Sequence, residues 1–227
     1  LHGAAAPRVH RLTVWLLRHG ALPCGAQAAH MAVLRGARDA AAVPRLLCCV
    51  PQCAQAGLAD TLSHRFLHCP VAAAVWQWVA DVWTASAGGP APPRSAAVLL
   101  AGDRRQWDPG GEEASHRWVA LQLAALHFLW TGTEAARRAG GHAQPAAVVA
   151  RIAHALRAHM ARDFTRATLQ PTEYAGVCGA WLPSRPRRSL EWFAAAWAAR
   201  GALCSIAGGR RVQHQSPCPP AGRGGPP

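Results

Sequence analysis

The chain has 227 residues, of which 51% are hydrophobic and 15% charged, and this balance places it among globular proteins with one large or two small domains. It contains no run of 18 or more apolar residues, so we expect no transmembrane helix and no membrane partner. All 24 basic residues are Arg and Asn is absent, which indicates a GC-rich genome; part of the net charge of +13 then reflects codon bias, and charge alone does not establish an anionic partner.

Two helices are predicted near the start, over residues 8–19 and 25–38. Apolar residues such as Leu12 and Leu16 recur at helical spacing in the first, and a Gly- and Pro-containing stretch separates the two.

Three cysteines and a histidine then fall within 21 residues: Cys49, Cys53, His64 and Cys69. Zinc takes four ligands tetrahedrally, and two ligand pairs on short loops can close around one ion. Three residues separate Cys49 from Cys53 and four separate His64 from Cys69, and both spacings allow a short loop to turn its two ligands toward one ion. The spacing therefore predicts one zinc ion.

Other interpretations of these residues stay open. Cys48 can replace Cys49 as the first ligand, and His68 is a possible substitute beside Cys69. Free cysteines also serve as small buried hydrophobic residues. A disulfide framework fits poorly, because no signal peptide precedes the cysteines and the remaining ones are scattered.

The wider context carries a resemblance to a known family. The stretch reads Cys-Cys-Val-Pro-Gln-Cys at 48–53, Asp-Thr-Leu-Ser-His at 60–64, Phe-Leu-His-Cys-Pro at 66–70 and Val-Trp at 75–76. Over residues 8–84 it resembles the zinc-binding domain that follows the polymerase in LINE-type (non-LTR) retrotransposon reverse transcriptases. The resemblance implies a structural zinc held by a cysteine pair with His64 and Cys69, and binding to RNA or DNA. The cysteine pair of the family is usually two residues apart, so this chain departs from the pattern at the first ligand.

The resemblance does not extend to an enzyme. A polymerase needs paired aspartates for its metal ions, and the chain contains no close Asp pair, no phosphate-binding loop and no hydrolase motif. We expect no catalytic residues and no small-molecule substrate; a Cys-His hydrolase is the least favoured alternative. Because the chain begins at Leu1 without Met, we expect a fragment of a longer element or a decayed copy of one.

Val71 to Thr84 is the clearest predicted helix. Its valines and three tryptophans occupy one arc, with Gln77 and Asp81 opposite, and Pro70 suits its first turn. Tryptophans near arginines can stack on unpaired bases, but their shared arc with valines favours a role in the core.

Residues 86–111 are rich in Gly and Pro and are predicted to be a linker or a loop draped on the core. Helices are expected at about 113–139 and 145–168. In the second, Arg151, Arg162 and Arg166 gather on one face, where they are candidate phosphate contacts or simply a solvated surface.

A short helix over residues 189–200, with Ser189 as N-cap, ends the predicted fold. The fold class is therefore mostly α: a zinc-binding domain (1–85), a linker (86–111), a helical region (112–203) and a disordered tail (204–227). Reduced cysteines imply an intracellular compartment, nucleus or cytoplasm. The expected function is a zinc-binding, nucleic-acid-binding accessory module, and the alternative is a zinc-stapled interaction domain that binds no nucleic acid.

Overall fold

The computed structural model describes residues 6–25, 30, 46–168, 189–201, 203–207 and 210–213. The described part of the chain is mostly helical, as predicted. Its elements in order are α1 (Arg8–Arg18), α4 (Pro51–Gln55), the π-helical turn η2 (His64–His68), α5 (Pro70–Ala87), the π-helical turn η3 (Ala97–Ala101), α6 (Glu112–Arg138), α7 (Pro145–Thr168), α9 (Leu190–Phe193), the π-helical turn η4 (Ala194–Ala198), β1 (Cys204–Ala207) and β2 (Arg210–Gln213). Among these residues, no helix combines the length and the apolar character needed to cross a bilayer.

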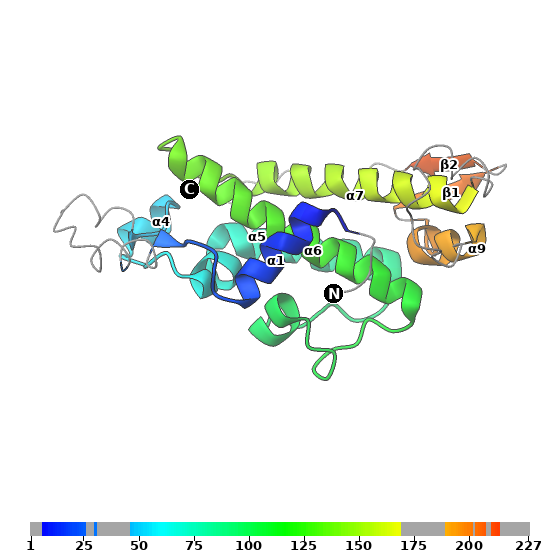
Figure 1. Cartoon of the computed structure of the whole chain (residues 1–227), viewed down its shortest axis with the longest axis horizontal. Helices are drawn as coiled ribbons and strands as arrows, with labels where there is room; N and C mark the ends of the chain where they lie inside the picture. The colour runs from blue at the N-terminus through cyan, green and yellow to red at the C-terminus, as the bar shows by residue number, and fades with distance from the viewer. Residues whose placement is uncertain are drawn as a thin grey trace, which may run out of the picture.

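The long helices α5, α6 and α7 form the body of the molecule, and α1 lies across α6 (Figure 1). The segment around α4 lies at one end of the long axis, and α9 with the β1–β2 hairpin lies at the other (Figure 1). A single hydrophobic cluster draws side chains from all of the long helices, and Val14, Val79, Leu126 and Ile152 are among its most deeply buried members.

Helix α1 confirms the first predicted helix and buries Val14 and Leu17 while leaving Trp15 exposed. The second predicted helix, residues 25–38, falls almost wholly outside the described residues.

Helix α5 confirms the predicted tryptophan helix and its buried face. The arc residues are all buried: Val71, Val75, Trp76, Trp78, Val79, Val82 and Trp83. The Trp76 Nε1–H group donates to the carbonyl oxygen of Phe66 at 2.7 Å, which ties α5 to η2. Because these rings are buried, they are not available to stack on bases.

The segment between α5 and α6 lies against the core through η3. The Gln122 side-chain amide of α6 donates to the carbonyl oxygens of Val98 (3.1 Å) and Leu99 (2.9 Å). Trp107 packs edge-on against Trp118, with ring centroids 4.9 Å apart. These contacts hold the segment against the core.

The C-terminal region confirms one prediction and corrects another. Ser189 caps the predicted short helix by accepting a hydrogen bond from the Trp192 amide at 3.1 Å. The predicted disordered tail was expected to begin at residue 204, but Cys204 is fully buried and β1 pairs antiparallel with β2. The sequence between the strands is Gly-Gly, a two-residue hairpin signal. Residues 214–227 lie outside the described residues.

Candidate metal centre

The first half of the centre is a tight loop that returns on itself around α4. Leu47 and Ala59 form an isolated antiparallel bridge, and the Cys48 amide donates to the Leu58 carbonyl oxygen at 3.0 Å. Pro51 at the start of α4 and Gly57, with a φ of +66°, turn the chain at the two ends of this helix. The loop brings the side chains of Cys48 and Cys53 to the same side.

The second half is the turn that leads into α5. The Thr61 hydroxyl accepts a hydrogen bond from the His64 amide at 3.0 Å, which starts the turn. The Cys69 amide then donates to the His64 carbonyl oxygen at 2.7 Å, five residues back, so the turn is π-helical. Cys69 is the N-cap residue of α5, and the turn sets its sulfur close to the ring of His64.

Cys48, Cys53, His64 and Cys69 form a group able to hold a metal ion: one ligand atom from each lies within 4.8 Å of all the others, and all four residues are buried. The sulfurs of Cys48 and Cys69 are 3.9 Å apart. A tetrahedral ion with bonds of about 2.3 Å places sulfurs about 3.8 Å apart, whereas a disulfide needs about 2.05 Å. The sulfur spacing fits a metal and not a disulfide.

The His64 ring supports the same assignment. Its Nε2 atom is buried and has no hydrogen-bond partner among the described residues. A buried polar atom without a partner costs about 1 to 3 kcal/mol. A metal ion bound between this nitrogen and the three sulfurs removes that cost, so the residues present fit the ion.

The structure places Cys48, and not the predicted first ligand Cys49, in the group with the other predicted ligands. The Cys49 sulfur points instead toward α6, where it lies 4.0 Å from the carbonyl oxygen of Thr133. The Cys49 thiol contacts the Cys48 thiol, so it lies beside the group without being one of its four members. The other three predicted ligands are brought together.

The surroundings of two candidate ligands, Cys69 and His64, shift their pKa values toward the protonation state that binds a metal. The hydrogen bond from the Cys48 thiol is the largest cause that lowers the pKa of Cys69, and the backbone amides at the start of α5 lower this pKa further. Burial lowers the pKa of His64, which keeps its ring neutral, the form that binds metals. Burial raises the pKa of Cys53, so this thiol needs a metal to lose its proton near neutral pH.

A buried ionic network holds the loop in place between its two ligand pairs. The Asp60 carboxylate is 1% exposed and accepts hydrogen bonds from the Gly25 amide (2.7 Å), from Arg65 Nε (3.0 Å) and Nη2, and from Arg137 Nη2. Arg65 also contacts Glu134 of α6 at 2.5 Å and lies over the Trp130 ring at 4.5 Å from its centroid. The network thus joins the metal loop to α6.

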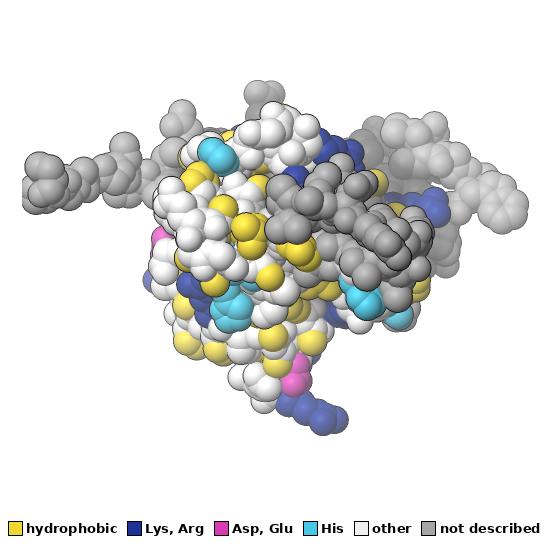
Figure 2. Space-filling model, turned by 90° about the vertical axis from the view of Figure 1, so that its left-hand side faces the viewer, with side chains coloured by type: hydrophobic (Ala, Val, Ile, Leu, Met, Phe, Trp, Pro, Cys, Tyr) yellow, Lys and Arg dark blue, Asp and Glu magenta, His cyan; other side chains and the backbone are white. Residues whose placement is uncertain are grey.

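The candidate nucleic-acid contacts lie away from this centre. Arg151, Arg162 and Arg166 are exposed on α7, and the Arg151 guanidinium lies 5.0 Å from the centroid of the Phe128 ring. On the end of the molecule seen in Figure 2, basic side chains stand at several separate places rather than in one patch. The three α7 arginines are thus on a different element from the four residues of the metal group.

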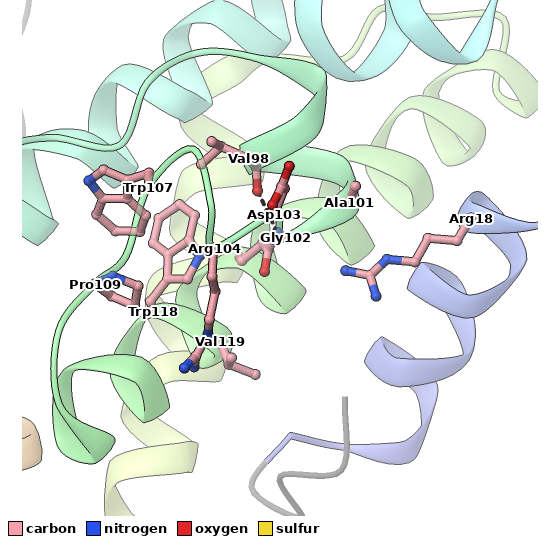
Figure 3. Close-up of a pocket in the computed structure, with 11 residues that line it drawn as sticks. Arg18, Val98, Ala101, Gly102, Asp103, Arg104, Trp107, Pro109, Trp118 and Val119 are labelled. Atoms are coloured by element: carbon pink, nitrogen blue, oxygen red, sulfur yellow. Dashed lines mark hydrogen bonds between the residues drawn. The ribbon is translucent and has the colours of Figure 1, made fainter.

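A small pocket of about 150 Å³ lies between α1, η3 and α6. Arg18, Asp103 and Arg104 line it together with the rings of Trp107 and Trp118 (Figure 3). Arg18 reaches it from α1 and donates through Nε to the Leu100 carbonyl oxygen at 3.2 Å. None of the cysteine-cluster residues lines this pocket.

Sequence reasoning missed a second group, made of His116, His159 and Asp163, which the structure brings together and buries. One signal pointed to it: His159 and Asp163 are four residues apart and share a helix face. His116 lies 47 positions before Asp163 in the sequence, so no local pattern links it to the other two; only the packing of α6 on α7 brings them together.

No match was found when the chain was compared with models of protein families, with curated proteins and with solved structures.

Proposed function

We propose that Cys48, Cys53, His64 and Cys69 bind one zinc ion. The observation that carries this proposal is the buried group of three sulfurs and one imidazole, with ligand atoms within 4.8 Å of one another; the His64 ring in it also has a buried Nε2 atom without a hydrogen-bond partner among the described residues. Three thiolates and one imidazole are a soft ligand set that suits zinc and disfavours magnesium or calcium. Four protein ligands close the coordination sphere, so the ion leaves no position for a reactive water and its role is structural.

The module is further proposed to bind nucleic acid, as the accessory part of a retrotransposon reverse transcriptase that its zinc loop resembles. Support comes from the charge on two helices. Helix α1 carries three arginines and no acid, and the one acid of α7, Asp163, is buried. Burial lowers the pKa of His10 on α1 to about 4, and neighbouring basic groups, Arg162 of α7 among them, add to the shift. Arg162 of α7 thus lies close enough to α1 for its charge to act on His10.

The salt dependence of binding tests this function. Duplex DNA and single-stranded RNA are titrated with zinc-loaded protein by fluorescence anisotropy at several salt concentrations. Phosphate contacts make log K fall linearly with log salt, with a slope of about −0.9 per contacted phosphate on duplex DNA. Replacing Arg151, Arg162 and Arg166 with Gln is expected to make the slope shallower by up to about 2.7, because each arginine that binds a phosphate contributes about 0.9 to it.

The matched control removes the same charge elsewhere, by replacing the exposed Arg104, Arg105 and Arg138 with Gln. If both triple variants weaken binding equally, the α7 face is not the binding surface. If wild-type protein does not bind at low salt, the nucleic-acid function is wrong. The second candidate function, a zinc-stapled interaction domain, would then stand, as the buried tryptophans and the Asp60–Arg65 network favour.

A further inference from the structure

A second cluster of metal-ligating side chains lies near the opposite end of the long axis from the cysteine group. His116 comes from the start of α6, and His159 and Asp163 come from adjacent turns of α7. All three are buried, at 7%, 3% and 1% exposure. The rings of Trp192 and Trp197 stand edge-on to His116, with centroids 4.8 and 5.7 Å away. The three polar side chains are therefore buried next to aromatic rings.

One oxygen of the Asp163 carboxylate is well satisfied. Oδ2 lies 2.7 Å from His116 Nε2 and accepts a hydrogen bond from Trp197 Nε1 at 3.0 Å. The other oxygen, Oδ1, has no hydrogen-bond partner among the described residues, and neither does His159 Nε2. The His159 nitrogen lies 3.4 Å from Oδ2 without forming a hydrogen bond to it.

A simple ion pair between an imidazolium and a carboxylate explains only half of this arrangement. It accounts for the short contact between His116 and Asp163 and the longer 3.4 Å contact between His159 and Asp163, but it leaves Oδ1 and His159 Nε2 buried without hydrogen-bond partners in the described part of the chain. Each such atom costs about 1 to 3 kcal/mol, and native structures contain few of them. Two of them in one cluster, on groups that are both metal ligands, indicate an ion as the missing partner.

We propose that His116, His159 and Asp163 bind a divalent transition-metal ion, independently of the cysteine group. One ligand atom from each residue lies within 4.8 Å of the other two. On binding, His116 Nε2 gives up any proton it holds in its contact with Oδ2, and the ion takes that place between imidazole and carboxylate. Two imidazoles and one carboxylate suit Zn²⁺, Co²⁺ or Fe²⁺ and leave further coordination positions open.

The site would also fasten the C-terminal segment to the helical body. The ion would hold α6 to α7 directly, and Trp197 of η4 orients the Asp163 ligand through its hydrogen bond to Oδ2. Arg117, the neighbour of His116, donates through Nε to the Ala196 carbonyl oxygen at 2.6 Å and binds the same segment.

Cobalt titration tests the proposal on the full chain. The reduced protein is first given one equivalent of Zn²⁺, which the thiolates retain, and is then titrated with Co²⁺. We expect one further equivalent to bind, with visible d–d absorption and no thiolate-to-cobalt charge-transfer band. His159→Gln should abolish this second binding, whereas His154→Gln, an exposed histidine on the same helix, should leave it unchanged.

The wild-type titration decides whether a second ion binds, so the test does not depend on any variant folding. Histidine ligation is checked in the wild type by cobalt-shifted imidazole proton resonances in the NMR spectrum. The proposal is overturned if no second equivalent binds, if the second ion shows a thiolate charge-transfer band, or if His154→Gln removes it as effectively as His159→Gln.

Discussion

Replacing Asp60 with Asn removes the centre of the buried network that joins the metal loop to α6. Asn keeps the size of the side chain, but it loses the negative charge that faces Arg65 and Arg137. Arg65 is 2% exposed and keeps only the Glu134 carboxylate, at 2.5 Å, as an ionic partner among the described residues. Breaking a buried ion pair by removing one partner costs about 3 to 5 kcal/mol. Because Glu134 remains, we expect the lower value, a loss of about 3 kcal/mol in the free energy of unfolding.

Urea unfolding of zinc-loaded protein, followed by the helical circular dichroism signal, measures this loss. The matched control is Asp81→Asn on the exposed face of α5, where the carboxylate accepts a hydrogen bond from Gln77 at 2.9 Å. Surface changes of this kind stay within about 0.5 kcal/mol. A loss below about 1 kcal/mol for Asp60→Asn, at equal metal content, would refute the view that this network anchors the loop.

Three further predictions concern the core, a buried histidine and the metal. Trp76→Phe removes the hydrogen bond to the Phe66 carbonyl oxygen and should lower the free energy of unfolding, measured in urea, by about 1 to 3 kcal/mol. Trp15→Phe, at a half-exposed position, should lower it little. Equal losses for the two variants would contradict the assigned role of Trp76. Burial lowers the folded-state pKa of His10 to about 4, so the unfolded chain binds more protons than the folded one below pH 6.5. The free energy of unfolding should therefore fall by up to about 3 kcal/mol as the pH drops from 6.5 toward 4. His10→Gln should reduce this pH dependence of stability, and an unchanged pH dependence would contradict the prediction. Chelation of zinc under reducing conditions should lower the helical circular dichroism signal, since structural zinc sites contribute about 10 kcal/mol or more; a helical signal that survives complete zinc removal would argue against a structural ion.

The sequence predicts the helices well because their apolar periodicity is strong. The valine and tryptophan arc of α5 is buried as expected. The β1–β2 hairpin was missed because its strands are only four residues long and are followed by a Gly- and Pro-rich stretch that predicts disorder. The position of the hairpin depends on the burial of Cys204, whose thiol lies 3.6 Å from the carbonyl oxygen of Trp197. No local sequence pattern shows this contact.

The sequence predicts three of the four residues of the cysteine group: Cys53, His64 and Cys69. None of the three stands directly beside a second residue of its own type, so the position of the ligand is not ambiguous by one residue. The sequence does not choose between Cys48 and Cys49, since both spacings suit a turn and only the folded loop brings the Cys48 sulfur to the other three ligand atoms. The second cluster is harder still, because His116 reaches α7 only through helix packing.

The most direct test of the central claim compares two neighbouring cysteines. Cobalt is titrated into reduced wild-type protein and into Cys48→Ser and Cys49→Ser, and the thiolate-to-cobalt charge-transfer absorption is measured. Only sulfur ligands produce this band, so a second site made of histidine and carboxylate does not contribute to it. With three thiolate ligands, Cys48→Ser should lose about one third of the band or all of it, and Cys49→Ser should match the wild type. Full intensity in Cys48→Ser together with a loss in Cys49→Ser would contradict the ligand assignment, and no band in the wild type would contradict the metal centre itself.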